Sequence, residues 1–135
     1  MALTVELVSP ERIAFSGEAG MVVCRTTAGD IAFQPGHVPF IGVLQTHPVK
    51  VIGEGGEETV IAVHQGFVEV SPTDSTGHTR VTILSDVAEL AATIDVDRAR
   101  SAKERAEEAL RADPDDPEAR SALERANVRL DVAAA

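Results

Sequence analysis

The stretch Ile94-Asp95-Val96-Asp97-Arg98-Ala99 marks the point where the chain changes from short strands to helices. Residues before it read as closely spaced strands, whereas residues after it read as two helices joined by a turn. The charge changes here too: residues 1–93 hold 4 basic and 11 acidic residues, and residues 94–135 hold 8 basic and 11 acidic residues. We therefore expect two domains, formed by residues 1–88 and residues 89–135.

Composition places the chain among soluble globular proteins. Its 135 residues are 44% hydrophobic and 25% charged, which allows a modest core and argues against disorder. The apolar runs are too short to cross a membrane, and the N-terminus lacks the pattern of a signal peptide. The net charge of −10 argues against nucleic acid or an anionic membrane as the main partner. We expect a cytoplasmic protein, alone or on a membrane-bound partner.

No catalytic or metal-binding constellation emerges from the side chains. The single cysteine, Cys24, excludes an internal disulfide and lies in an apolar run, which indicates a buried strand residue. The sequence has neither a phosphate-binding glycine loop nor a nucleophile elbow. The four histidines show no metal-ligand spacing; they are His37, His47, His64 and His78. We expect neither an enzyme acting alone nor a metal site.

The first part of the chain predicts a sheet. Leu3, Val5 and Leu7 alternate with more polar residues, the pattern of a half-buried strand. Similar short runs recur up to residue 84, separated by turn residues and with no helical period between them. This spacing predicts an antiparallel β-sandwich or flattened barrel rather than alternating strands and helices.

The second part predicts a helical hairpin. Thr93 or Asp95 can cap the first helix, and Asp116 with Pro117 can start the second. The apolar seam of the hairpin is mostly alanine, with Val96, Leu110, Leu123 and Leu130 as its larger members. Each fully buried Leu contributes about 1.5–3 kcal/mol, and isolated helices of this length are marginal. We therefore expect a hairpin that is only weakly held closed.

Arginines gather on this hairpin. Arg98 and Arg105 share one face of the first helix, and Arg125 and Arg129 share one face of the second. If the helices are antiparallel, the two pairs could converge on phosphate oxygens. The alternative is a solvated face balanced by nearby glutamates, and spacing alone favours this alternative.

Three segments carry a family resemblance. They are Gly29-Asp30-Ile31-Ala32-Phe33-Gln34-Pro35-Gly36-His37-Val38-Pro39, Gly66-Phe67-Val68-Glu69-Val70 and Val81-Thr82-Ile83-Leu84-Ser85-Asp86-Val87-Ala88-Glu89. In this order they resemble segments of the epsilon subunit of the F-type ATP synthase, along essentially the whole chain. Ala32 and Gln65 stand where that family usually has Gly, and the loop of residues 73–77 is long.

The resemblance implies an N-terminal antiparallel β-sandwich followed by a C-terminal two-helix antiparallel hairpin. It implies a non-catalytic rotor subunit of a proton-translocating complex, peripheral on the cytoplasmic face of the bacterial plasma membrane without inserting into it. The implied partners are the gamma subunit, the c-ring and the alpha/beta head. The residues implied in contact with gamma and the c-ring are Asp30, Pro35, Gly36, His37, Pro39 and Phe40.

Residues 94–99 also match the Ile/Leu-Asp-x-x-Arg-Ala motif of family members that bind ATP as a regulatory ligand, with no metal required. The implied roles are base and ribose contacts from Glu89, Ile94 and Asp95, and phosphate contacts from the arginines. The full implied site is Glu89, Ile94, Asp95, Arg98, Ala99, Arg105, Arg125 and Arg129. In such members ATP holds the hairpin folded, and the extended hairpin inhibits ATP hydrolysis. This resemblance favours a nucleotide site over the solvated face.

A different class of function remains as an alternative. The chain could be a freestanding ligand-binding β-sandwich whose helices form an oligomerisation arm. The acidic charge and the absence of Trp and Tyr speak against a carbohydrate groove of that kind.

Overall fold

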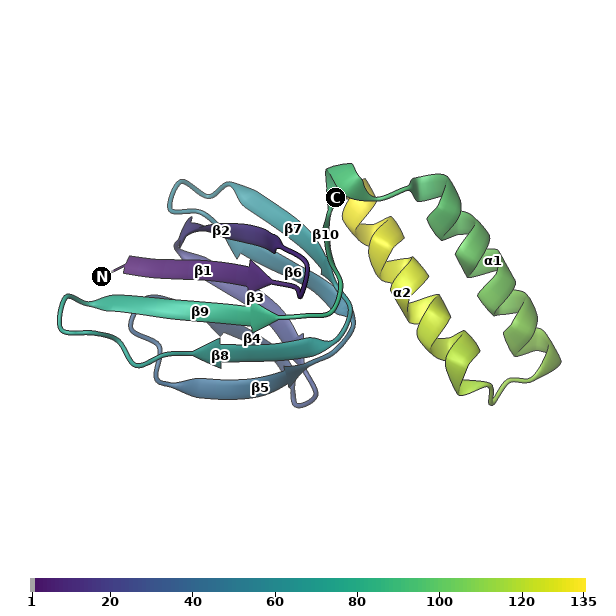
Figure 1. Cartoon of the computed structure of the whole chain (residues 1–135), viewed down its shortest axis with the longest axis horizontal. Coiled ribbons are helices and arrows are strands. Elements are labelled where there is room, and N and C mark those ends of the chain that lie inside the picture. Colours follow the sequence, from purple (N-terminus) through teal and green to yellow (C-terminus); the bar gives the residue numbers. More distant parts are fainter. Residues whose placement is uncertain (1) are drawn as a thin grey trace.

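A computed structural model describes residues 2–135 as a β-sandwich followed by two antiparallel helices (Figure 1). The strands are β1 Ala2–Val8, β2 Ile13–Ala19, β3 Met21–Thr26, β4 Gly29–Phe33, β5 Phe40–Leu44, β6 His47–Ile52, β7 Glu58–Val63, β8 Gly66–Val70, β9 His78–Leu84 and β10 Ala88–Leu90. A 3-10 turn at Ala91–Thr93 leads to α1 Val96–Ala112 and α2 Pro117–Ala134. The predicted sandwich and hairpin are confirmed.

The strands form one hydrogen-bonded sheet that folds over on itself. Their order is β10-β7-β6-β3-β5-β8-β9-β1-β2, with β4 paired to β3. Among the described strands the pairing is antiparallel, as predicted, except that β1 runs parallel to β9. Alternate residues of each strand point inward, so Leu3, Val5 and Leu7 are fully buried. Cys24 is buried in the same core, and this burial raises the pKa of its thiol to about 12, so it is unreactive.

The sheet extends past the expected domain boundary. Residues 88–90 form β10, which pairs with β7 and places Glu89 opposite Ala62. The sequence pattern does not reveal this strand, because three residues are too few to show an alternating pattern. Glu89 therefore belongs to the sandwich in the structure and not to the hairpin.

The helices begin where the sequence predicts. Asp95 Oδ1 accepts a hydrogen bond from the Arg98 backbone N–H at 3.0 Å, which caps α1. Asp116 caps α2 by accepting from the N–H groups of Glu118 and Ala119, and Pro117 occupies the first turn. Alanines form the contact between the helices, and those that are buried are Ala99, Ala106, Ala119 and Ala126.

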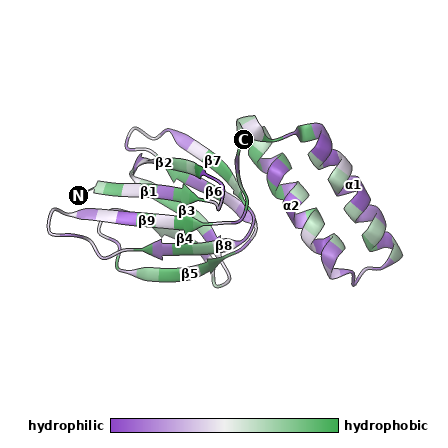
Figure 2. Ribbon diagram, viewed as in Figure 1, coloured by the Kyte–Doolittle hydropathy of each residue, from purple (hydrophilic) through white to green (hydrophobic). Residues whose placement is uncertain are grey.

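The hairpin lies on the sandwich through α2, which is placed between the sandwich and α1 (Figure 1). Figure 2 shows hydrophilic residues along both helices and hydrophobic residues concentrated in the strands. A second, small core joins the two parts, built from Ala62, Ile94, Val128 and Val132, with Val60 and Ala133 beside them. The predicted apolar seam did not include Val128 and Val132, because they face the sandwich and not α1. This small contact area holds the hairpin closed.

Candidate functional site

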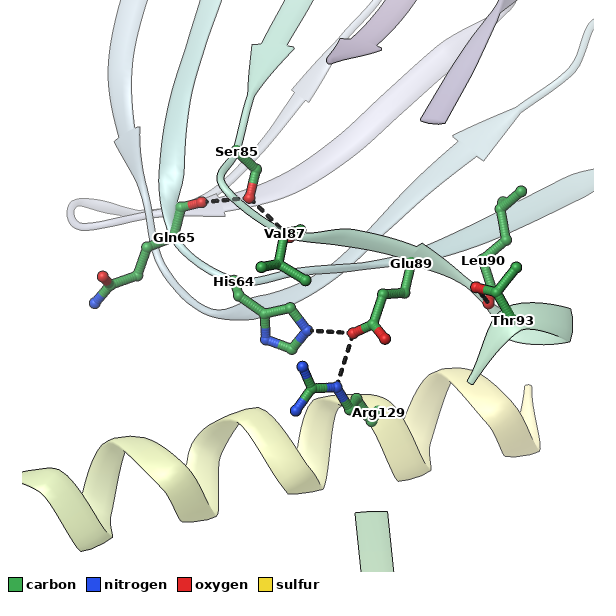
Figure 3. A network of polar contacts seen from close by, with 8 residues as sticks. All are labelled: His64, Gln65, Ser85, Val87, Glu89, Leu90, Thr93 and Arg129. Carbon is green, nitrogen blue, oxygen red and sulfur yellow. Dashed lines mark hydrogen bonds and ion pairs between the residues drawn. The ribbon is translucent and has the colours of Figure 1, made fainter. Parts of the chain in front are cut away.

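Glu89 lies at the junction between the sandwich and the hairpin (Figure 3). Its Oε1 accepts a hydrogen bond from Arg129 Nε on α2 at 2.7 Å, and it lies 2.9 Å from His64 Nε2. The pairing of β10 with β7 brings Glu89 next to His64, which directly follows β7. One carboxylate oxygen of Glu89 therefore connects the sheet to α2 of the helical hairpin.

The hydrogen bonds at this junction keep the Glu89 carboxylate ionised. Burial raises the pKa of Glu89, but the hydrogen bonds from Arg129 and His64 outweigh it and leave the pKa below its usual value. Glu89 is therefore ionised at neutral pH. A charged, hydrogen-bonded pair of this kind is stronger than a neutral hydrogen bond.

His64 has an environment that favours the neutral ring. Its side chain is only 4% exposed, and burial lowers its pKa; the hydrogen bond to Glu89 opposes this, while Arg129 and Arg125 add to it. A neutral ring bonded to an ionised carboxylate donates from Nε2–H, which leaves Nδ1 as the acceptor. Nδ1 is buried and has no hydrogen-bond partner within residues 2–135.

A tight turn fixes the backbone around His64. Ser85 Oγ lies 2.7 Å from the carbonyl oxygen of Gln65 and 2.9 Å from that of Val87, and it joins the turn after β7 to the segment before β10 (Figure 3). The His64 N–H donates to the Val87 carbonyl at 3.2 Å. Gln65 takes a φ of 60°, the one non-glycine residue with positive φ among residues 2–135. This turn holds the imidazole toward Glu89.

The other residues of the implied ATP site are divided between buried and exposed positions. Ile94 is buried with Val128 and Val132, and Ala99 is buried against α2. Arg98 and Arg105 are exposed on α1, and within residues 2–135 their side chains make no hydrogen bond or ion pair. The structure thus joins Glu89 to Arg129 by a hydrogen bond. No contact in the described chain joins the arginine pair of α1 to that of α2.

Arg125 is half-buried on α2 and lines a small cavity of about 240 Å³. The cavity lies between α2 and the ends of β6 and β7. Its lining residues are Thr46, His64, Gln65, Val87, Ser121, Glu124 and Arg125. The cavity combines cationic and hydroxyl groups with one carboxylate, which makes it a polar space at the edge of the junction.

Sequence reasoning missed His64. The four histidines show no metal-ligand spacing, and His64 lies at the end of an ordinary strand pattern. Its partners are 25 residues away, at Glu89, and on a helix that the local pattern does not place. No spacing rule could have found this cluster.

The loops implied in partner contact are well ordered by local bonds. Asp30 Oδ1 accepts from Arg25 Nε at 2.7 Å, and this bond lowers the pKa of Asp30. The rings of Phe33, His37 and Phe40 contact one another in a triangle. The His37 centroid lies 4.9 Å from that of Phe33 and 6.4 Å from that of Phe40, and the two Phe centroids are 5.6 Å apart. These rings set the shape of a turn in which Pro35 is half-buried and Gly36 and Pro39 are exposed. Gly36 takes a φ of 86°, a conformation that suits glycine.

An exposed apolar stripe was not predicted. Val43, Phe67 and Leu84 lie side by side on β5, β8 and β9, because Val43 pairs with Phe67 and Phe67 pairs with Leu84. All three side chains are exposed, and Phe67 is 56% exposed. Ile41, also on β5, is 75% exposed and is the fourth member of the apolar stripe. A groove of about 940 Å³ lies beside this stripe. Contiguous exposed apolar residues of this kind mark interaction surfaces.

No group of three or more metal-ligating side chains is arranged around an ion position in the described chain. Over residues 2–135, neither helix has the length and apolar character needed to span a bilayer.

Comparisons with known proteins agree with this architecture. The model of the ATP synthase delta/epsilon chain β-sandwich domain matches residues 2–91, and that of the long α-helix domain matches residues 93–134. The ATP synthase epsilon chain of Thermobifida fusca is 47% identical over 137 residues, covering 98% of this chain and 93% of that protein. The epsilon chain of Streptomyces griseus is 44% identical, covering 95% of this chain and 92% of its own length.

Solved structures show the same fold. A chain in the cryo-EM structure of the Euglena gracilis mitochondrial ATP synthase, OSCP/F1/c-ring in rotational state 1, superposes with a TM-score of 0.76 at 23% identity. The match covers 99% of this chain and 82% of that one. From the two family models and the identity to its bacterial relatives, the chain belongs to the ATP synthase epsilon family, whose members are non-catalytic stalk subunits of the F-type complex.

Proposed function

We propose that this epsilon subunit couples gamma to the c-ring as part of the rotor and regulates ATP hydrolysis through an ATP-sensitive hairpin. The observation that carries the regulatory part is the junction itself. Within residues 2–135, the hairpin is joined to the sandwich by one ion pair, Glu89 with Arg129, and by a small core around Val128 and Val132. Such a junction can open without unfolding the sandwich, which has a separate core.

The energy of this junction is compatible with a switch. Burying one valine or isoleucine side chain contributes about 1.5–3 kcal/mol, and only Ile94, Val128 and Val132 of that size are buried in the described junction core. Opening also hydrates the ion pair and increases the conformational entropy of the linker. These two effects offset part of the free energy gained by burying the apolar side chains. A ligand that binds only the closed state therefore needs a differential affinity of a few kcal/mol to control it.

ATP is the ligand that the arginines favour. Arg129 and Arg125 lie on the side of α2 that meets the sandwich, and guanidinium groups suit phosphate oxygens. ATP would compete with Glu89 for Arg129, and Glu89 would then be free to accept a hydrogen bond from the base or ribose. Arg98 and Arg105, which have no side-chain partner in the described chain, would add phosphate contacts. ATP would close the hairpin, and low ATP would free the extended, inhibitory form that reaches the alpha/beta head.

Docking on the rotor would use the sandwich. The apolar stripe of Ile41, Val43, Phe67 and Leu84 is a suitable contact for a helical stalk partner such as gamma. The turn around His37 and the Asp30 loop would meet the polar loops of the c-ring. The subunit would then sit at the cytoplasmic face of the bacterial plasma membrane, held there by the complex.

Titration of the isolated full-length chain with ATP tests the ligand. We expect saturable binding that Arg98→Ala and Arg125→Ala both weaken. The matched controls are Arg100→Ala on α1 and Arg120→Ala on α2, because Arg100 pairs with Asp97 and Arg120 with the Pro114 carbonyl. Absence of binding at millimolar ATP, or equal losses in the controls, would rule out this ATP site.

ATPase assays of the assembled complex test the regulation. Complexes with the full chain should hydrolyse ATP more slowly at low ATP than complexes that lack residues 94–135. If the two rates agree at every ATP concentration, the hairpin is not inhibitory and the rotor role stands alone.

A further inference from the structure

His64 is the most enclosed ionisable group at the junction, and charges face it from each element packed around it. Glu89 on β10 lies 2.9 Å from its Nε2, and Arg129 on α2 binds the same Glu89 oxygen. Arg125 and Glu124 on α2 line the cavity beside it. On the neighbouring strand β6, His47 is paired in register with Val63, next to His64.

Protonation would change this environment unfavourably in two ways. The added proton would reside on Nδ1, which is buried without an acceptor in the described chain, and an unsatisfied buried donor is costly. The ring would also become a cation near two guanidinium groups, and the carboxylate bonded to it, Glu89, is already shared with Arg129. When α2 moves away, the ring gains water and loses the two arginines.

We propose that His64 makes the closed hairpin sensitive to pH, so that protonation of its imidazole releases α2 from the sandwich. The closed state binds this proton more weakly than the open state, because burial and the two arginines lower the pKa of His64 in the closed state. By linkage, the closed hairpin keeps its full stability at pH values above the open-state pKa of His64, and it loses stability as the pH falls from that value toward the lower closed-state pKa. Acidification opens the junction, and alkaline pH closes it.

This proposal concerns the closed hairpin alone and goes beyond ATP regulation. Its consequence for hydrolysis rests on the proposed function, but its test needs neither nucleotide nor partner subunits. A chain that fails to bind ATP can still show the pH response, so the two failures are distinguishable.

The experiment measures the distance between the hairpin and the sandwich by electron spin resonance. Spin labels on Ser101→Cys in α1 and Lys50→Cys in β6 occupy exposed positions on the two parts. The native Cys24 is buried and stays unlabelled. Between about pH 7.5 and about pH 5.5, the ratio of closed to open molecules should fall by up to about tenfold for each pH unit below the open-state pKa.

Two variants locate the response. His64→Gln keeps a side-chain N–H for Glu89 but cannot titrate, and we expect a ratio independent of pH. His47→Gln is the matched control, because His47 is also partly enclosed and burial lowers its pKa, yet it makes no hydrogen bond to Glu89; it should keep the wild-type response. A pH response that survives in His64→Gln, or a closed fraction that rises on acidification, overturns the proposal.

Nuclear magnetic resonance of the unmodified chain gives an independent reading. The nitrogen shifts of His64 should report the Nε2–H tautomer and a titration midpoint below that of an exposed histidine. An Nδ1–H tautomer, or a midpoint above the ordinary value, contradicts the proposal even if His64→Gln does not fold.

Discussion

Arg129 on α2 donates from Nε to Oε1 of Glu89 on β10, and this 2.7 Å bond joins residues 40 positions apart. The same Glu89 oxygen lies 2.9 Å from His64 Nε2, so the carboxylate links α2 to His64. Because Glu89 and Arg129 also belong to the implied ATP site, the same bond that closes the hairpin is the one a nucleotide would exchange.

Loss of this bond should loosen α2. Arg129→Ala leaves Glu89 half-buried with only His64 as partner, at a cost of about 1–2 kcal/mol for a partly exposed charged hydrogen bond. Amide hydrogen exchange in the last two turns of α2 should accelerate, while exchange in β1 and β9 should not. Arg120→Ala, at an exposed site on the same helix, should leave both unchanged. Equal exchange in the two variants would show that the ion pair does not hold the hairpin.

The junction core can be tested without touching a charge. Val132 on α2 is fully buried against the sandwich. Val132→Ala therefore removes two buried methyl groups and should cost about 1.5–2.5 kcal/mol of closed-state stability. Val38→Ala, at an exposed site in the loop before β5, is the control. The measurement is the closed fraction by the same spin-label pair. A variant as closed as the wild type would place the hairpin's stability elsewhere.

The cap at Asp95 should stabilise the start of α1. Asp95→Ala removes the acceptor for the Arg98 N–H and should cost about 1 kcal/mol. Asp97→Ala in the same turn should cost only a few tenths, because its ion pair with Arg100 is exposed. Helix content by circular dichroism and exchange at the first turn of α1 compare the two. Equal losses would mean that charge at the helix start, and not the cap bond, is responsible.

Gly66 should tolerate no side chain. Its φ is 149°, and an added Cβ would lie 2.1 Å from the carbonyl oxygen of Leu84, so Gly66→Ala should cost at least about 3 kcal/mol. Gly29→Ala separates backbone strain from steric clash, because Gly29 has a φ of 122° but open space around its Cα. Urea denaturation should show a much smaller loss for Gly29→Ala. Similar midpoints would indicate that strand β9 moves aside.

The apolar stripe should determine binding to the stalk partner. Phe67→Ser removes the central exposed ring of the stripe and should weaken binding to purified gamma at least tenfold, the size of effect typical of an aromatic interface anchor (about 2 kcal/mol or more). Ile13→Ser is the matched control, because Ile13 is similarly exposed but lies on β2, outside the stripe. If both variants bind gamma like the wild type, the stripe is not the docking surface.

Much of the architecture could be predicted from local sequence. Alternating apolar residues predicted the strands, and the aspartates before each helix, together with Pro117, predicted the helix starts, because these signals depend only on near neighbours along the chain. The ends of β2 and the short β10 could not be predicted. β2 runs through Ser16 and Gly17, two residues with a weak strand preference that the pairing with β1 overrides.

What the sequence by itself determined was therefore the order of elements, the faces of the strands, the caps and the family, all of which are encoded in periodicity and motif. What only the tertiary structure decided was which distant side chains meet: the parallel pairing of β1 with β9, the packing of Val128 and Val132 on Ala62, and the cluster of His64, Glu89 and Arg129. The physical reason is that periodicity reveals which face of an element is buried but not what buries it. The partners of Glu89 depend on where α2 lies, and that position is set by the closure of the whole sheet and by a core of a few small side chains.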